Sequence, residues 1–226
     1  KVVLDKEKKN VIIGLADEWS SDNIPQEWKD NATVFKAYLK PEQEQGNVHS
    51  FPLGYNKKHT KLPNKPIQSR PIDVFFAGHM ASTNRRHYLR WVIDYFQEMP
   101  RSKRPKLDFN ITRGFNTGLN GKEYSQKLHD AKIVVCPAGN VSMETFRHYE
   151  AMRSGAIVVS PKLPGTKIYK DAAICQVDDW EGNVGDTIMD LLSDSDMLQL
   201  VQQTYNNRFT ATSVAKYINE LLPDTK

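Results

Sequence analysis

Hydrophobic residues in this chain gather in short continuous runs that alternate with helical stripes. The clearest example predicts four elements in succession: a helix over Glu123 to Asp130, a buried strand over Ala131 to Cys136, a helix over Met143 to Arg153 and a buried strand over Ala156 to Ser160. Continuous apolar strands are typical of parallel sheets that are covered on both faces. Two such strands joined by one helix form a right-handed βαβ unit.

The same alternation of strand and helix patterns runs along most of the chain. Apolar runs or period-two alternation predict further strands over Val11–Leu15, Thr33–Leu39, Ile72–Ala77, Leu107–Thr112 and Ile174–Val177, with another beginning at Val48. Apolar residues three or four apart predict helices over Arg85–Met99, Val184–Leu192, Ser195–Asn206 and Ser213–Leu222. The pattern predicts an α/β protein with parallel sheets.

A stretch rich in lysine and proline divides these elements into two groups. Residues 56 to 70 contain four lysines and two prolines, a composition typical of an exposed linker. We expect a small N-terminal half over residues 1–68, with three strands, and a larger Rossmann-like half over residues 69–226. The N-terminal half is short enough to be called reduced.

The turn between the strand ending at Cys136 and the following helix is a candidate anion site. Pro137 ends the strand, Gly139 permits unusual backbone angles, and Ser142 is the expected N-cap of the helix. Free amides at a helix start favour an anion such as a diphosphate. Arg147 and Glu150 follow on one helix face, where they could serve a phosphate and a ribose diol, or could simply form a surface ion pair.

Two more groups of residues belong to the same expected edge of the sheet. Gly78 and His79 follow the strand that begins at Ile72, and Arg85 and Arg86 fall in the first turn of the next helix. Cations are unfavourable at a helix N-terminus, so a bound anion would compensate for them. Arg113 ends another strand on the same side, although a loop arginine can be incidental.

At this point the residues resemble a known family. The segment CPAGNVSMETFRHYEAMRSGAIVV is similar to the signature of exostosin-type glycosyltransferases (glycosyltransferase family 47), in which a C-P-x-G turn precedes an S/T-F-R-x-x-E-A helix. Phe75 to Gly78 followed by Arg85 and Arg86 resembles the F-x-G turn and arginine of that family. The resemblance covers about residues 72 to 180. It departs where Ile157-Val158-Val159 replaces Ile-Pro-Val and where His79 replaces Asn.

The resemblance implies a GT-B fold and an inverting transfer of a sugar from a UDP-sugar donor to a hydroxyl of an oligosaccharide or glycoprotein glycan. Xylose, rhamnose, glucuronate and galactose all stay open as the sugar. The first half would then serve the acceptor and the second half the nucleotide sugar. The donor-binding set that follows contains Gly78, His79, Arg85, Arg86, Arg113, Pro137, Gly139, Ser142, Met143, Thr145, Arg147 and Glu150.

Inversion requires a general base opposite the leaving group, which we expect from the N-terminal half. Asp17 and Glu18 follow the strand Val11–Leu15 and are the candidates, with no basis for choosing between them. Their alternative role is capping the helix that follows. His79 is a second candidate, because an imidazole titrates near neutral pH.

Neither a metal nor a cofactor is expected. No D-x-D pair lies in a suitable loop, and the acidic pair Asp178-Asp179 is equally well explained as an exposed turn. No group of cysteines and histidines has metal-ligand spacing. Arginines and helix dipoles would then neutralise the departing diphosphate. A formal net charge of +4 suits an anionic small ligand and is too small to indicate nucleic acid.

Length and termini bear on the setting of the chain. At 226 residues it is shorter than a typical two-half GT-B enzyme, and it opens on Lys1 without a methionine, so we expect one domain of a larger polypeptide. A non-catalytic nucleotide- or carbohydrate-binding remnant is the alternative function. No run approaches a membrane span. A glycan on the Asn140 sequon would block the anion site, which favours the cytoplasm over a Golgi lumen with the anchor trimmed.

Overall fold

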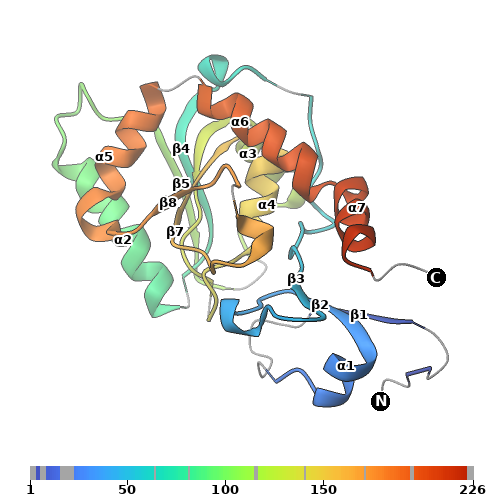
Figure 1. The fold of residues 1–226 in the computed structure, drawn as a ribbon. Helices are drawn as coiled ribbons and strands as arrows, with labels where there is room; N and C mark the ends of the chain where they lie inside the picture. The colour runs from blue at the N-terminus through green and yellow to red at the C-terminus, as the bar shows by residue number, and fades with distance from the viewer. Residues whose placement is uncertain are drawn as a thin grey trace.

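The computed structural model describes residues 4–5, 9–15, 23–63, 65–80, 82–114, 117–139, 141–170, 172–193 and 196–222. It contains two parallel sheets, one of three strands and one of five, and the molecule is elongated with the smaller sheet at one end (Figure 1). The predicted α/β class with parallel sheets and a reduced N-terminal half is confirmed. The division after residue 68 stays a prediction.

The small sheet has the order β1-β2-β3, with strands Asn10–Gly14, Ala32–Lys36 and Val48–Ser50. The helix α1 (Gln26–Asn31) and the 3-10 turn η1 (Pro41–Gln43) connect them. The central strand β2 is buried at every position, because β1 and β3 flank it and a small apolar cluster packs on it. The strand predicted over Thr33–Leu39 is observed over Ala32–Lys36, so it starts one residue earlier and ends three residues earlier than predicted.

The large sheet has the order β5-β4-β6-β7-β8. Its strands are β4 (Ile72–His79), β5 (Leu107–Thr112), β6 (Ala131–Val135), β7 (Ile157–Pro161) and β8 (Cys175–Val177). The chain moves outward from β4 to β5 and then returns to the other side of β4 as β6. The crevice beyond the carboxyl ends of β4 and β6 is therefore the topological switch point, where open α/β sheets bind ligands.

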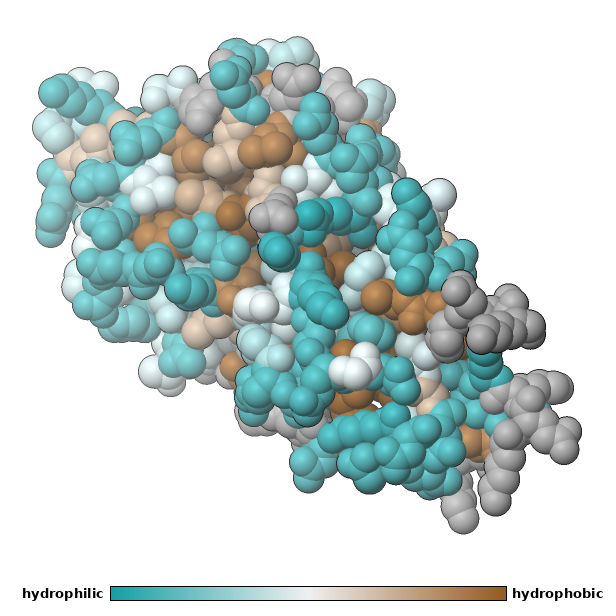
Figure 2. All heavy atoms as spheres, in the orientation of Figure 1, coloured by the Kyte–Doolittle hydropathy of each residue, from teal (hydrophilic) through white to brown (hydrophobic). Residues whose placement is uncertain are grey.

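Helices cover both faces of the large sheet (Figure 1). One face carries α2 (Thr83–Glu98) and α5 (Trp180–Ser193), and the other carries α3 (Gly121–Asp130), α4 (Phe146–Arg153) and α6 (Asp196–Thr204). The short elements η2 (Ile67–Ser69), η3 (Lys167–Tyr169) and η4 (Tyr205–Phe209) and the last helix α7 (Ala211–Leu221) complete the fold. In Figure 2 the surface over the small sheet is mostly hydrophilic.

The start of α4 differs from the prediction. The helix begins at Phe146 with Thr145 as N-cap, so the expected N-cap at Ser142 is wrong. The Ser142 hydroxyl instead accepts a hydrogen bond from the amide of Glu144 two residues later, at 3.1 Å. The Glu144 carboxylate is buried and accepts from Leu53 N and the Tyr149 hydroxyl. Burying Glu144 against these donors holds the preceding residues out of the helix.

The linker predicted over residues 56–70 is only in part exposed. We call its residues 56–63 and 65–66 the strap. Its Lys57, Lys58 and Lys61 are exposed as expected, but His59 is buried. The imidazole of His59 lies 3.0 Å from the Ser154 hydroxyl, and the Arg153 guanidinium donates to its Nδ1 at 2.9 Å. The strap is therefore fixed along α4.

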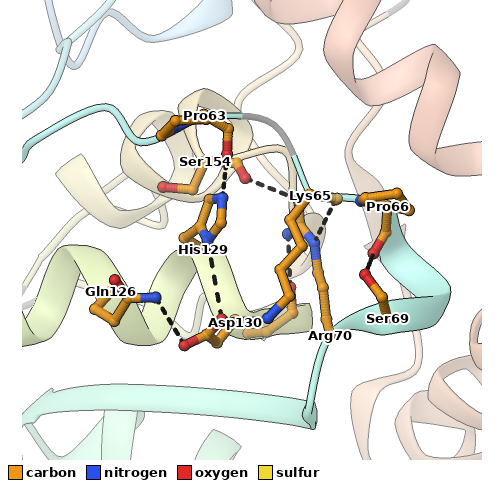
Figure 3. Close-up of polar contacts among 10 residues, drawn as sticks. Pro63, Lys65, Pro66, Ser69, Arg70, Gln126, His129, Asp130 and Ser154 are labelled. Atoms are coloured by element: carbon orange, nitrogen blue, oxygen red, sulfur yellow. Dashed lines mark hydrogen bonds and ion pairs between the residues drawn. The ribbon is translucent and has the colours of Figure 1, made fainter.

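Arg70, just past the strap, anchors the base of the sheet (Figure 3). Its guanidinium donates to the carbonyls of Ala131 at 2.8 Å and Ser154 at 3.0 Å. Nearby, Lys65 forms an ion pair with Asp130 at 2.7 Å. Because an arginine that bridges two carbonyls leaves little freedom to the chain on either side, the strap enters β4 in a fixed direction.

Candidate functional site

Two arginines meet at the topological switch point. Arg85, in the first turn of α2, and Arg147, in the first turn of α4, come from opposite faces of the sheet and line one cavity of about 290 Å³. The cavity opens beyond the carboxyl ends of β4 and β5, and Gly78, His79 and Thr112 form part of its wall. The structure thus brings together cations that lie 62 residues apart in the sequence (147 − 85).

Arg147 is a buried cation with spare hydrogen-bonding capacity. Its side chain is 9% exposed, and its Nη2 donates to the Ala77 carbonyl at 2.7 Å. The guanidinium lies 4.7 Å from the centre of the Phe76 ring. Its Nε and Nη1 atoms are buried and have no hydrogen-bond partner among the described residues. Buried charges without partners are costly, so this arrangement is suited to an anion that enters from outside.

Arg85 is held across the switch point by two carbonyls. Its Nε donates to Ala138 O at 3.0 Å, in the loop after β6, and its Nη1 donates to His79 O at 2.8 Å, at the end of β4. Ser82 caps the helix, because its hydroxyl accepts from the Arg85 amide. The second cation is thereby fixed at the mouth of the crevice.

Glu150 joins the strap to the site. Its carboxylate is 5% exposed and accepts from the Asn56 amide at 3.1 Å and from the Tyr124 hydroxyl at 2.8 Å. Burial, together with the nearby Glu150 charge, raises the pKa of Tyr124 well above its usual value, so the phenol stays protonated and donates. Burial raises the pKa of the neighbouring Cys136 thiol to about 12, so Cys136 adds no negative charge.

The start of α4 is stabilised by a buried histidine. The Thr145 amide donates to Nδ1 of His148 at 3.2 Å, and Nε2 of His148 lies 2.8 Å from the Ser160 hydroxyl. Burial lowers the pKa of His148 to about 3, so the ring is neutral. The first amides of a helix have no intrahelical partner, and Phe146 and Arg147 at the start of α4 both line the cavity.

A second cavity of about 630 Å³ adjoins the first. Asn56, Thr117, Tyr124 and Glu150 line both, and the larger cavity extends between the strap and the start of α3. Sequence reasoning missed the contributions of Asn56, Thr112, Gly114, Thr117, Tyr124 and Phe146. Phe146, which is 44% exposed, adjoins Arg147 and could have been noticed, whereas nothing in the linker pattern marks Asn56.

The other predicted residues are placed less centrally. Arg86 is exposed and contacts Thr83, and Arg113 contributes its carbonyl, which lies 2.7 Å from the His79 ring. Pro137 and Gly139 are buried in the loop after β6, where the Gly139 amide donates to the Ser142 carbonyl at 2.7 Å. Met143 lines a different cavity, beside α2. Asp17 and Glu18 lie outside the described residues, so their proposed role stays a prediction.

The described residues offer neither a metal site nor a membrane-spanning helix. No group of three or more His, Cys, Asp or Glu side chains there could hold a metal ion. None of the helices in those residues is long and apolar enough to cross a membrane.

Comparison with known proteins bears on the fold. No family model and no curated protein matches the chain. Among solved structures, it is similar to a chain of the GtfA/B complex (15% identity, TM-score 0.57), to WaaG, a glycosyltransferase involved in lipopolysaccharide biosynthesis (12%, 0.54), and to Anabaena Alr3699/HepE in complex with UDP (13%, 0.53). The fold is GT-B. These similarities support no specific relation to the exostosin-type family.

The matches cover nearly all of this chain but a smaller share of each similar structure. They cover 94%, 86% and 95% of this chain, but 52% of the GtfA/B chain, 64% of WaaG and 72% of HepE. The chain thus spans less than two thirds of the first two GT-B chains. At these identities the match concerns the fold alone.

Gly78 lies so close to Arg147 that a larger residue at this position would contact the guanidinium. A Cβ added at Gly78 would lie 2.5 Å from Arg147 Nη2 and 3.3 Å from the Phe76 ring. We expect Gly78→Ala to displace the guanidinium and to weaken binding of a small anion such as pyrophosphate in this cavity by about tenfold, as expected for losing a charge-assisted hydrogen bond. Isothermal titration checks this. The Gly165→Ala variant, at a glycine that has open space for a Cβ and does not line the cavity, controls for general effects, and equal affinities in Gly78→Ala and wild type would contradict the expected displacement.

Proposed function

We propose that the protein is a glycosyltransferase that moves a sugar from a UDP-sugar to a hydroxyl of a glycan acceptor, with inversion and without a metal. The observation that carries the proposal is the buried Arg147 guanidinium, whose Nε and Nη1 lack partners among the described residues, at the switch point of a GT-B sheet. A UDP-bound GT-B structure is among the similar proteins, which supports a nucleotide sugar as the donor.

The chemistry follows from the charges at the site. When the bond between sugar and diphosphate breaks, negative charge develops on the leaving diphosphate. Arg147, Arg85 and the first amides of α4 would stabilise that charge in place of a metal ion. Glu150 would accept hydrogen bonds from a ribose diol, in exchange for those it now receives from Asn56 and Tyr124.

The acceptor hydroxyl must lose a proton as it attacks. We assign this role to Asp17 or Glu18, which follow β1 in the sequence. The carboxyl ends of the large sheet point toward the side of the molecule that carries β1 to β3 (Figure 1). A base supplied by the N-terminal half would therefore face the donor from across the crevice.

A non-catalytic nucleotide- or carbohydrate-binding remnant is the second candidate. The observation that favours it is the size of the N-terminal sheet, which has three strands among the described residues, against five in the other sheet. Such a domain would keep the donor cavity and lack a working acceptor side.

One set of measurements separates the two. Isothermal titration with UDP tests the nucleotide site, and hydrolysis of UDP-xylose, UDP-rhamnose, UDP-glucuronate and UDP-galactose, with and without EDTA, tests turnover and metal dependence. We expect Asp17→Asn or Glu18→Gln to abolish turnover while UDP still binds. UDP binding without turnover of any of these donors would favour the remnant. Absence of UDP binding would overturn both nucleotide-based proposals.

A further inference from the structure

A third cavity, of about 300 Å³, lies beside the N-terminal half of α2 and is separate from the arginine cavity. The ends of β7 and β8, the start of α5 and Met143 form the rest of its wall. Met143 lies two residues before Thr145, which lines the arginine cavity. Likewise α2 contributes Arg85 to one cavity and Tyr88 and Trp91 to the other. The two cavities therefore flank the same helix and the same loop.

Aromatic rings in defined orientations form the apolar part of this cavity. Trp91 is 36% exposed, and its indole nitrogen lies 3.2 Å from Nε2 of His87, so its polar edge faces that imidazole. Trp180 is buried, and its indole donates to the Tyr88 carbonyl at 2.8 Å. The Tyr88 and Trp180 rings meet edge to face at 5.4 Å. Because packing buries Trp180 and half-buries Tyr88, Trp91 is the most exposed of the three rings and offers its apolar surface to a ligand.

Carboxylates surround this apolar surface. Asp178, Asp179 and Glu181 line the cavity together with a single lysine, Lys162. The ion pair between Lys162 and Asp178, at 3.3 Å, joins side chains that are each 75% exposed and so constrains them little. The Glu181 carboxylate accepts from His87 at 2.8 Å. Oxygen acceptors therefore lie around aromatic rings.

We propose that this cavity binds a neutral saccharide. The C–H face of a sugar ring would pack on Trp91, and its hydroxyl groups would donate hydrogen bonds to the carboxylates, which bind more strongly than neutral acceptors. Three carboxylates against one lysine disfavour a uronic acid or a sulfated sugar. The sugar could belong to the donor or to the acceptor chain, which share this chemistry. The proposal extends the proposed function, yet saccharide binding here does not require transfer.

Binding of free sugars tests the proposal without any nucleotide. The probes are methyl β-galactopyranoside and methyl β-xylopyranoside, with methyl β-glucuronide as the anionic comparison, followed by saturation-transfer NMR and tryptophan fluorescence. We expect the wild type to bind the neutral glycosides more tightly than the glucuronide. Trp91→Ala should weaken that binding by about tenfold, a loss that is typical when a central aromatic side chain is truncated. Trp91→Phe should restore part of it.

The matched control is Arg90→Ala, at the neighbouring position of α2, whose guanidinium is exposed and paired with Asp94. It should leave glycoside binding unchanged. A second arm compares UDP-galactose with UDP: if Trp91→Ala weakens UDP-galactose as well as the free glycosides, the cavity holds the donor sugar, and if it weakens only the free glycosides, the cavity holds the acceptor. No binding of the neutral glycosides by the wild type, equal binding by Trp91→Ala, or preference for the glucuronide would overturn the proposal, whereas loss of UDP binding alone would not.

Discussion

Replacing Arg147 by methionine should weaken UDP binding by about 100-fold while leaving the protein at least as resistant to thermal unfolding as the wild type. Removing one partner of a buried hydrogen-bonded charge pair costs roughly 3 kcal/mol of binding free energy, which corresponds to this factor. The expected gain in stability has a separate cause. In the ligand-free protein, Nε and Nη1 of Arg147 are buried without a partner among the described residues, and methionine removes that unpaired charge.

This combination separates a binding role from a structural one. A purely structural arginine would stabilise the fold, so its loss would lower the melting temperature together with the affinity. A residue retained for a ligand costs stability until the ligand arrives. Isothermal titration with UDP and thermal unfolding of the same samples give both quantities.

The control for Arg147→Met is Arg86→Met. Arg86 was predicted to contact the diphosphate, but its side chain is exposed and contacts Thr83 outside the cavity. Its replacement should change UDP affinity by less than about twofold, as is usual for an exposed charge. If Arg147→Met binds UDP as tightly as the wild type, or if the two variants lose affinity equally, the proposed donor site is wrong.

Local sequence patterns predicted the elements of the large sheet well. Apolar runs such as Ile133 to Val135 and Ile157 to Val159 are buried on both faces in the structure, as parallel central strands require. The predicted placement of Arg147 and Glu150 at the carboxyl edge also agrees with the structure, because both follow from helix spacing and strand direction. The spacing of apolar residues and the order of the elements can be read directly from the sequence. The buried strands and the position of these two side chains depend mainly on those two signals.

Features that depend on tertiary contacts were not predictable. The start of α4 moved from Met143 to Phe146 because the Glu144 carboxylate is buried against Leu53, a residue 91 positions away. Asn56 belongs to the site only because the Glu150 carboxylate captures its amide. Likewise, four lysines made the linker pattern polar, although His59 within it is buried against α4. Long-range polar contacts leave no periodic trace in a sequence.

Acid should destabilise the fold through two buried histidines, His59 and His148. Burial is the main cause that lowers the pKa of His148 to about 3 and that of His59 to about 4, with Arg153 adding to the effect on His59. The unfolded chain takes up protons on both rings below about pH 6.5, whereas the native state does not. Stability is therefore lost as the pH falls through 6.5, until the native pKa values are reached.

The expected loss at pH 5 is about 2 kcal/mol from each histidine, because both native pKa values lie below that pH. Glu144 acts in the opposite direction, because burial raises its pKa and the native state then binds a proton more readily. Urea unfolding at pH 7.5 and pH 5 measures the difference. In His148→Asn, which keeps an acceptor for the Thr145 amide, the loss between the two pH values should shrink by about 2 kcal/mol.

His87→Asn provides the control for this measurement, because that imidazole is exposed, with 57% of its side chain accessible. Its replacement should leave the pH dependence of unfolding close to that of the wild type. An equal loss of stability in wild type and His148→Asn would contradict the buried, neutral state of His148. Because native His148 stays neutral at pH 5 and accepts from the Thr145 amide at the start of α4, the turn that positions Arg147 should stay intact at that pH and be disturbed only as the pH approaches 3.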